Sequence, residues 1–120
     1  MNEILGTLDK LGAETTDALE RFLDDEEMYL KYVREFPEEP SMGALVAAVE
    51  KEDYVQAEKS VHALKGIVNN LGFLPLADAA VDMLSELRDD NLEDALEAYD
   101  DVKEEYEKFC KAIISWRETE

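Results

Sequence analysis

The sequence has few of the residues that usually carry chemistry. Its 120 residues include one histidine, one cysteine, three prolines and five glycines. The single cysteine, Cys110, cannot form an internal disulfide, and this usage fits a reducing compartment, so we expect a cytoplasmic protein. One histidine and one cysteine without suitable spacing exclude a zinc site. We therefore expect the chain to hold no metal and no cofactor of its own.

Positive charge is also scarce. Twelve lysines and arginines stand against 31 carboxylates, which gives a net charge of −19. The phosphates of nucleic acids and anionic membrane surfaces would be repelled by such a chain. No apolar run approaches the roughly 18 residues of a membrane span, and the N-terminus lacks the basic start and apolar block of a secretion signal. The composition argues against nucleic-acid and membrane partners and favours a protein partner that approaches one local site.

Period-two alternation, the mark of a β-strand, is missing, whereas apolar residues recur at helical spacing. Within residues 1–12 the pattern predicts a short helix, and the acidic run 24–27 interrupts the next one, where we expect a kink or a break. Because the later connections are short, consecutive long helices should run antiparallel. We predict an all-α single domain: a short leading helix in residues 1–12 and an up-down antiparallel four-helix bundle in residues 13–120.

Local signals predict several helix ends. Asp53 and Gln56 resemble a capping box that opens the central helix, and Gly72 is a usual residue after a last helical turn. Ser41 is a plausible N-cap for the helical segment that precedes the central helix. Pro75 fits the first turn of the helix that follows the central helix. Spacings of three and four residues, typical of helices packed lengthwise, predict a core that includes Tyr54, Ala57, Val61, Leu64, Val68, Leu71, Leu76, Ala77, Ala80, Val81, Leu84 and Leu87.

One segment of the central helix is unlike the rest of the chain in charge. No Asp or Glu falls between Glu58 and Asp78, although these two residue types make up about one quarter of the sequence. The only histidine, His62, lies in this gap together with Lys59 and Lys65. The gap lowers the repulsion that an anionic group would meet there.

Helical geometry predicts that His62 points to solvent. At 100° per residue it lies about 140° from the centre of the apolar stripe. Lys65, Gly66, Asn69 and Phe73 fall on the same outward half. A lone histidine is most often an ordinary surface residue, and Phe73 either makes an exposed contact or covers the end of the bundle. Glycine inside a helix, however, costs about 1 kcal/mol relative to alanine, and the outward position of Gly66 favours a partner that approaches from outside.

These residue types suit reversible phosphoryl transfer. A neutral exposed imidazole is a nitrogen nucleophile, a lysine one turn away can pair with phosphate oxygens, and a glycine lets another protein's active site come close. Because the sequence has no glycine-rich phosphate loop, we expect no kinase activity. The predicted site has His62 as phosphoryl acceptor, Lys65 for phosphoryl stabilisation and Gly66 for partner access, with the binding residues Lys59, Ala63, Asn69, Asn70 and Phe73.

The spacing His62-x-x-Lys65-Gly66, followed by Leu71-Gly72, resembles the signature of histidine-containing phosphotransfer (HPt) domains. Residues 19–27 are similar to the early helices of that family, and the resemblance covers roughly residues 13–115.

The resemblance implies a carrier in a multistep two-component phosphorelay, and not an enzyme. Nε2 of His62 would accept a phosphoryl group from the aspartate of a response-regulator receiver domain and pass it to another receiver. Lys65 would stabilise the phosphoryl group and Gly66 would permit docking. Receiver domains and a hybrid histidine kinase are the partners implied, and the Mg²⁺ required would belong to the receiver.

A second interpretation stays open. The chain could be an acidic helical adaptor, or a member of this family that keeps the fold and uses its exposed face only for docking. In that case replacing His62 would leave partner function intact. No large exposed apolar stripe is predicted, so we expect a monomer.

Overall fold

The computed structural model describes residues 3–119, and its regular elements are all helical. Within this range there is no strand, which confirms the predicted all-α class. None of these helices combines the length and the apolar character of a transmembrane span. The elements in chain order are α1 (Glu3–Lys10), α2 (Thr15–Arg21), α3 (Glu26–Glu35), the 3₁₀ helix η1 (Phe36–Glu38), α4 (Pro40–Glu50), α5 (Tyr54–Leu71), α6 (Leu74–Arg88) and α7 (Leu92–Thr119).

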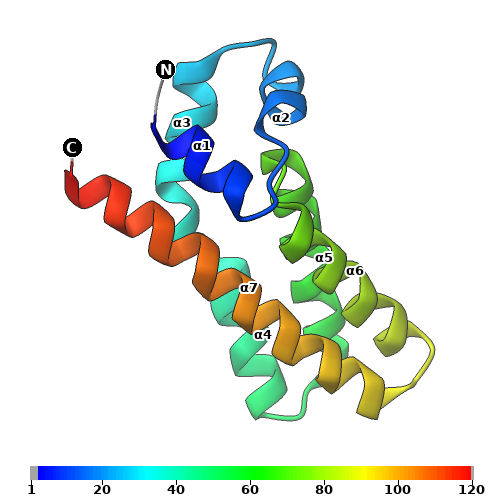
Figure 1. Cartoon of the computed structure of the whole chain (residues 1–120). Coiled ribbons are helices and arrows are strands. Elements are labelled where there is room, and N and C mark those ends of the chain that lie inside the picture. Colours follow the sequence, from blue (N-terminus) through cyan, green and yellow to red (C-terminus); the bar gives the residue numbers. More distant parts are fainter. Residues whose placement is uncertain (1–2, 120) are drawn as a thin grey trace.

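Helices α4 to α7 form the body of the molecule. Each packs against the next one along the chain, α4 on α5, α5 on α6 and α6 on α7. Short turns join them, and Figure 1 shows α5, α6 and α7 running in alternating directions. The shorter helices α1, α2 and α3 gather at the end of this body where α5 finishes, and α2 and α3 both contact α5. The N-terminal helices therefore cover the end of the helix that carries the predicted site.

The acidic run at residues 24–27 is a full break between two helices. Leu23 and Asp24 both take positive φ values, 55° and 60°, which lie outside the right-handed helical region. Asp25 then caps α3, because its side chain accepts a hydrogen bond from the backbone N–H of Met28 at 3.0 Å. The local chemistry thus ends one helix and starts the next within a few residues.

Two local predictions are wrong. Ser41 does not cap α4, because Pro40 is already its first residue and Glu39 is the N-cap, whose side chain accepts from the Ser41 N–H at 3.0 Å. Val81 does not belong to the core, since its side chain is 43% exposed. Met83, which the sequence pattern did not single out, is fully buried instead, so the inner face of α6 is rotated slightly from the predicted one.

Of the two alternatives for Phe73, the structure confirms that it covers the end of the bundle, so its prediction as a binding residue is wrong. It is fully buried, and its ring lies between those of Phe36 and Phe109, with centroid distances of 5.3 and 4.5 Å. The prediction extended the helical wheel of α5 beyond Leu71, but α5 ends there and Phe73 is the N-cap residue of α6. Phe73 therefore closes the end of the bundle and cannot meet a partner.

The predicted ends of α5 are confirmed. The Asp53 side chain accepts from the Gln56 N–H at 3.1 Å, and Gly72 follows the last turn with a φ of 81°. Gly72 is needed for a second reason, because a Cβ at this position would lie 2.7 Å from the carbonyl oxygen of Glu14. The Glu14 N–H in turn donates to the Gly72 carbonyl at 2.8 Å, which joins the start of α2 to the end of α5.

The last turn of a helix leaves four carbonyl groups without helical partners. At the end of α5 the turn itself supplies donors to two of them. The Phe73 N–H donates to the Val68 carbonyl at 2.9 Å, and the Gly72 N–H donates to the Asn69 carbonyl at 3.2 Å. This pair of hydrogen bonds around a left-handed glycine is the Schellman arrangement.

Side chains from α2 and α3 supply the remaining donors. The guanidinium of Arg21 donates to the carbonyls of Asn69 and Asn70, at 2.6 and 3.2 Å. The hydroxyl of Tyr29 donates to the Leu71 carbonyl at 2.7 Å inside the core. Every carbonyl of this last turn therefore has a partner, and two of the donors come from helices far away in the sequence.

Replacing Tyr29 with phenylalanine should weaken the fold at this point. Tyr29→Phe removes the donor to the buried Leu71 carbonyl, so we expect the free energy of unfolding at neutral pH to fall by about 1 kcal/mol. Urea unfolding followed by circular dichroism measures it. Tyr32→Phe is the matched control, because the Tyr32 hydroxyl is bonded to no described residue, and it should stay within about 0.5 kcal/mol of the wild type.

The same pair of variants should differ at alkaline pH. Burial, together with the nearby charge of Asp9, raises the pKa of Tyr29 in the folded state well above its ordinary value. Its contribution to stability is therefore complete below about pH 10, where an unfolded tyrosine ionises, and is lost as the pH rises further. We expect the stability of the wild type and of Tyr32→Phe to fall more steeply above about pH 10 than that of Tyr29→Phe; equal slopes would contradict this account.

Candidate functional site

Helix α5 has an inner face that packs in the core and an outer face that carries the predicted site. Its inner face places Ala57, Val61, Leu64 and Val68 fully in the core. Lys65 is half-buried at the edge of the outer face, which exposes Lys59, His62, Ala63, Gly66, Asn69 and Asn70. Apart from Phe73, the structure thus brings the predicted site residues together on one surface of one helix.

His62 stands free on this surface. Among the described residues, none forms a hydrogen bond or an ion pair with its ring. A histidine that serves the fold is usually fixed by such a partner. Both ring nitrogens are therefore available to a group that comes from outside.

The cations beside His62 are likewise uncompensated. No carboxylate of residues 3–119 forms an ion pair with Lys59 or Lys65. Glu58, the last carboxylate before the gap in the sequence, pairs with Arg88 of α6 at 3.8 Å, with both side chains about half exposed. The positive charge of the two lysines thus remains available to an anionic group.

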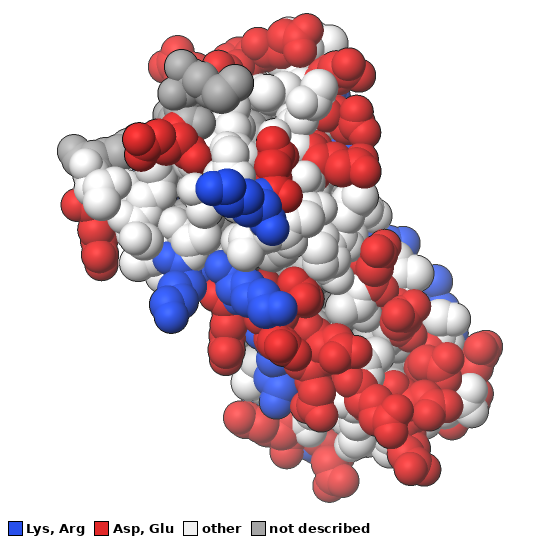
Figure 2. Space-filling model, in the orientation of Figure 1, with Lys and Arg blue, Asp and Glu red and all other residues white. Residues whose placement is uncertain are grey.

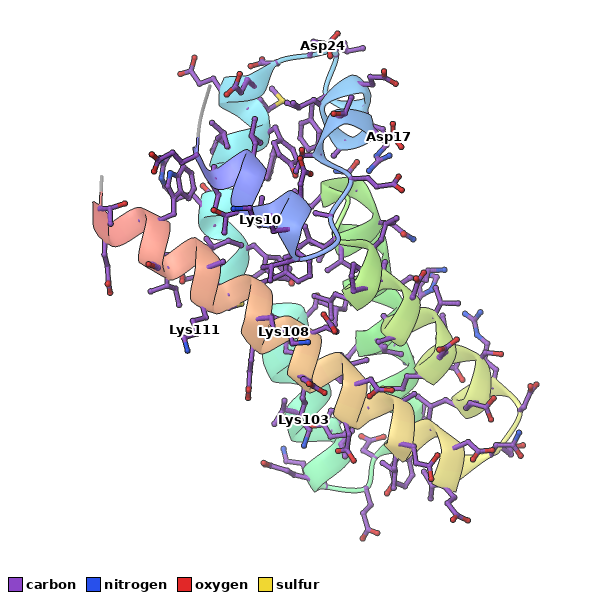
Figure 3. All side chains as sticks on the ribbon, in the orientation of Figure 1. Lys10, Asp17, Asp24, Lys103, Lys108 and Lys111 are labelled. Atoms are coloured by element: carbon purple, nitrogen blue, oxygen red, sulfur yellow. The ribbon has the colours of Figure 1, made fainter. Side chains whose placement is uncertain are left out.

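Two lysines of α7 provide the contrast. Figure 2 shows a face on which red carboxylates outnumber the lysines and arginines, which form a few separate blue patches. Along α7 (Figure 3), Lys103 lies 3.6 Å from Asp100, and Lys108 lies 3.3 Å from Glu105. Exposed pairs of this kind contribute little to stability, but they cancel charge locally. The cations of α5 differ from these two lysines because Glu58, the carboxylate of α5 nearest to them in the sequence, pairs with Arg88 instead.

Gly66 has no structural reason to be glycine. A Cβ at this position would have nothing within 4 Å outside the backbone of its own helix. Its conformation is ordinary right-handed helix, in contrast to that of Gly72. The absence of a side chain therefore leaves an open strip of backbone one turn from His62 and lowers helix stability without any packing gain.

A groove borders this strip on the side of α3 and α4. We call it the α3–α5 groove; its volume is about 980 Å³. Its lining comes from Tyr32, Glu35, Phe36, Glu38, Glu39, Pro40, Ala63, Gly66, Ile67, Asn70 and Leu71. Because Ala63 and Gly66 belong both to this lining and to the site, the groove opens directly beside His62.

Sequence reasoning did not find the groove or Arg21. Arg21 and Gly66 line a shallower depression at the end of α5, and the guanidinium of Arg21 holds the backbone of Asn69 and Asn70 there. No periodicity or motif could have linked Arg21 to residues almost fifty positions away. The walls of the groove likewise meet only after α3 and α5 have packed together.

The described part of the chain contains no group of three or more His, Cys, Asp or Glu side chains arranged to hold a metal ion. The chemical resources seen on the α5 surface are charge and exposure. An imidazole with free nitrogens, an unpaired ammonium group and bare backbone can receive a small anionic group that another protein delivers.

These features define a class of protein: a small helical bundle that exposes one histidine, with a lysine and a glycine about a turn further along the same helix. A family model described as the Hpt domain matches residues 17–112. The chain therefore belongs to the Hpt domain family, as its sequence predicted, and this family comprises histidine phosphotransfer modules of two-component phosphorelays. Comparisons with curated proteins and with solved structures found no match.

Replacing Gly66 with alanine should stabilise the fold. Because the added methyl group meets no atom, Gly66→Ala gains helix propensity and should raise the free energy of unfolding by up to about 1 kcal/mol. Chemical denaturation measures this gain. Gly43→Ala is the matched control, since Gly43 lies in α4, is exposed and has equally open surroundings. Destabilisation by Gly66→Ala alone would show that Gly66 serves packing after all.

Proposed function

We propose that this chain is a phosphoryl carrier in a multistep phosphorelay, with His62 as the acceptor. In the accepting step, Nε2 of His62 attacks the phosphorus of a phosphoaspartate on a receiver domain. The phosphorus–oxygen bond to the aspartate breaks as the nitrogen–phosphorus bond forms, and the receiver regains its free carboxylate. The delivering step is the reverse reaction with an aspartate of another receiver.

The observation that carries the proposal is the free, outward imidazole of His62 on a stretch of α5, from Lys59 to Leu71, that contains no carboxylate. A nitrogen nucleophile must keep its lone pair unused until the phosphoryl group arrives. A partner within the fold would hold that lone pair, and a neighbouring carboxylate would repel the phosphoryl oxygens. The ring of His62 has no such partner among the described residues, and the nearest carboxylate of α5 in the sequence, Glu58, is paired with Arg88.

Lys65 and Gly66 receive distinct roles in this mechanism. Lys65 lies three residues after His62, so both side chains project from neighbouring turns and the unpaired ammonium group can contact phosphoryl oxygens. Gly66 leaves room for the partner's active site to bring its aspartate in line with the imidazole nitrogen. Lys59 and Ala63 extend the contact surface along α5.

The proposal assigns the remaining chemistry to the partner. Phosphoryl transfer to and from an aspartate requires compensation of the phosphoryl charge, which a Mg²⁺ ion in the receiver would supply. The carrier contributes one nucleophile and one cation, and it has no kinase activity of its own. Receiver domains and a hybrid histidine kinase are the partners we propose.

Replacing His62 tests the proposal. We expect His62→Gln to abolish the transfer of radioactive phosphate from phosphorylated receiver domains, because the amide is not a nucleophile. The variant should keep its circular dichroism spectrum and remain within about 0.5 kcal/mol of the wild type in stability, since the side chain is exposed. Labelling that survives in His62→Gln would contradict the proposal, and a binding partner whose response is unchanged by the variant would favour an adaptor.

Gly66→Ala should separate stability from transfer. The methyl group occupies the open strip beside His62, so we expect the rate of transfer from a receiver to fall roughly tenfold to a hundredfold while the fold becomes more stable. Rapid-quench measurements of label transfer give the rate. Gly43→Ala should leave it unchanged, and equal rates for both variants and the wild type would remove Gly66 from the docking surface.

A further inference from the structure

The α3–α5 groove is asymmetric in charge. Its α5 wall is formed by uncharged residues, and its base includes Phe36 and Leu71. The opposite wall carries three carboxylates, those of Glu35, Glu38 and Glu39. An occupant must therefore combine an apolar face with a positive edge on the side of α3.

Two of these carboxylates are already engaged within the fold. Glu39 accepts hydrogen bonds from the backbone N–H and the hydroxyl of Ser41, at 3.0 and 2.8 Å, and thereby caps α4. Glu38 pairs with Arg117 of α7 at 2.6 Å. These two side chains serve the structure and offer little uncompensated charge to a partner.

Glu35 is different. Its exposed side chain forms neither an ion pair nor a hydrogen bond with any described residue. It is also the last residue of α3, the end of a helix at which the dipole favours cations and disfavours carboxylates. The fold thus gains nothing from this carboxylate, which stands on the rim of a groove that opens beside His62.

We propose that Glu35 is a specificity-determining residue of the phosphotransfer surface. The α3–α5 groove accepts an apolar surface of the receiver domain that exchanges the phosphoryl group, and Glu35 selects receivers in which this surface carries a lysine or arginine on its edge. This inference rests on the proposed function of His62. Charge complementarity and the direct continuity of the groove with Ala63 and Gly66 support this occupant over an unrelated ligand.

A charge swap tests the assignment. With a receiver that exchanges label with the wild type and has a basic residue beside its phosphorylated aspartate, we expect Glu35→Lys to reduce the transfer rate about threefold to tenfold. Changing the basic residue of that receiver to glutamate should restore the rate in Glu35→Lys and lower it in the wild type. The difference should shrink at about 0.5 M salt, where exposed charges are screened.

The control separates a local contact from the general field. Glu97→Lys makes the same change of net charge at an exposed residue of α7 outside the groove, and it should alter the rate by less than about twofold. Equal effects of the two variants, or no rescue by the altered receiver, would overturn the role of Glu35.

A second variant tests the groove itself. Tyr32 lines the groove and is 46% exposed. Tyr32→Ser should therefore lower the transfer rate about fivefold without unfolding the chain. The control is Ile114→Ser, at an exposed apolar residue of α7 outside the groove, which should leave the transfer rate unchanged. Unchanged transfer in Tyr32→Ser would overturn the proposed docking. So would self-association of the wild type in sedimentation experiments that Tyr32→Ser abolishes, because a second copy would then fill the groove.

Failure of this inference is distinguishable from failure of the proposed function. If receivers label His62 and the Glu35 and Tyr32 variants transfer like the wild type, the inference alone is wrong. Phosphoramidate is a small phosphoryl donor that needs no docking surface. If it labels the wild type at His62 but no phosphorylated receiver of a broad panel does, the proposed receiver partners are wrong, and this inference is wrong with them.

Discussion

The structure depends on how the end of α5 is held. The last carbonyls of a helix need donors from outside its own hydrogen-bond ladder, because a carbonyl left unsatisfied in the interior costs free energy. Here the turn around Gly72 serves two carbonyls, Arg21 of α2 strengthens one of these and serves a third, and Tyr29 of α3 serves the fourth. The N-terminal helices are thereby fixed to the end of the helix that carries His62.

This attachment also determines which face of α5 meets solvent. The inner face is held against α6 by the core, and the end of the helix is held by α2 and α3, so α5 cannot rotate without breaking both sets of contacts. The outer face with His62 and Gly66 is what remains uncovered. Packing of α3 beside α5 then creates the α3–α5 groove as a by-product of the same contacts.

The part of this arrangement that is local in sequence could be predicted from the sequence. Asp53, Gln56 and Gly72 act within one turn of the helix end that they define, and the core stripe of α5 follows from its three-and-four spacing. For the same reason the outward position of His62 followed from its angle to that stripe.

The errors at the site concern positions that the periodicity of a single helix does not describe. Phe73 lies beyond the glycine that ends α5, so the wheel of α5 no longer describes it, and contacts with Phe36 and Phe109 decide its position instead. Arg21 and the walls of the groove were not found for a related reason. Their proximity to the site is a product of tertiary packing, which leaves no periodic mark in a single sequence.

Gly66 in α5 and Gly72 at its end differ in what requires the glycine. Gly72 is required by its positive φ and by the close approach of Glu14, so a side chain there would damage the fold. Gly66 has neither constraint, and an alanine would fit and make the helix more stable. A residue that lowers stability without improving packing is most simply explained by a contact outside the chain. Since Gly66 adjoins both His62 and the α3–α5 groove, this contact is the one that the proposed transfer requires of the partner.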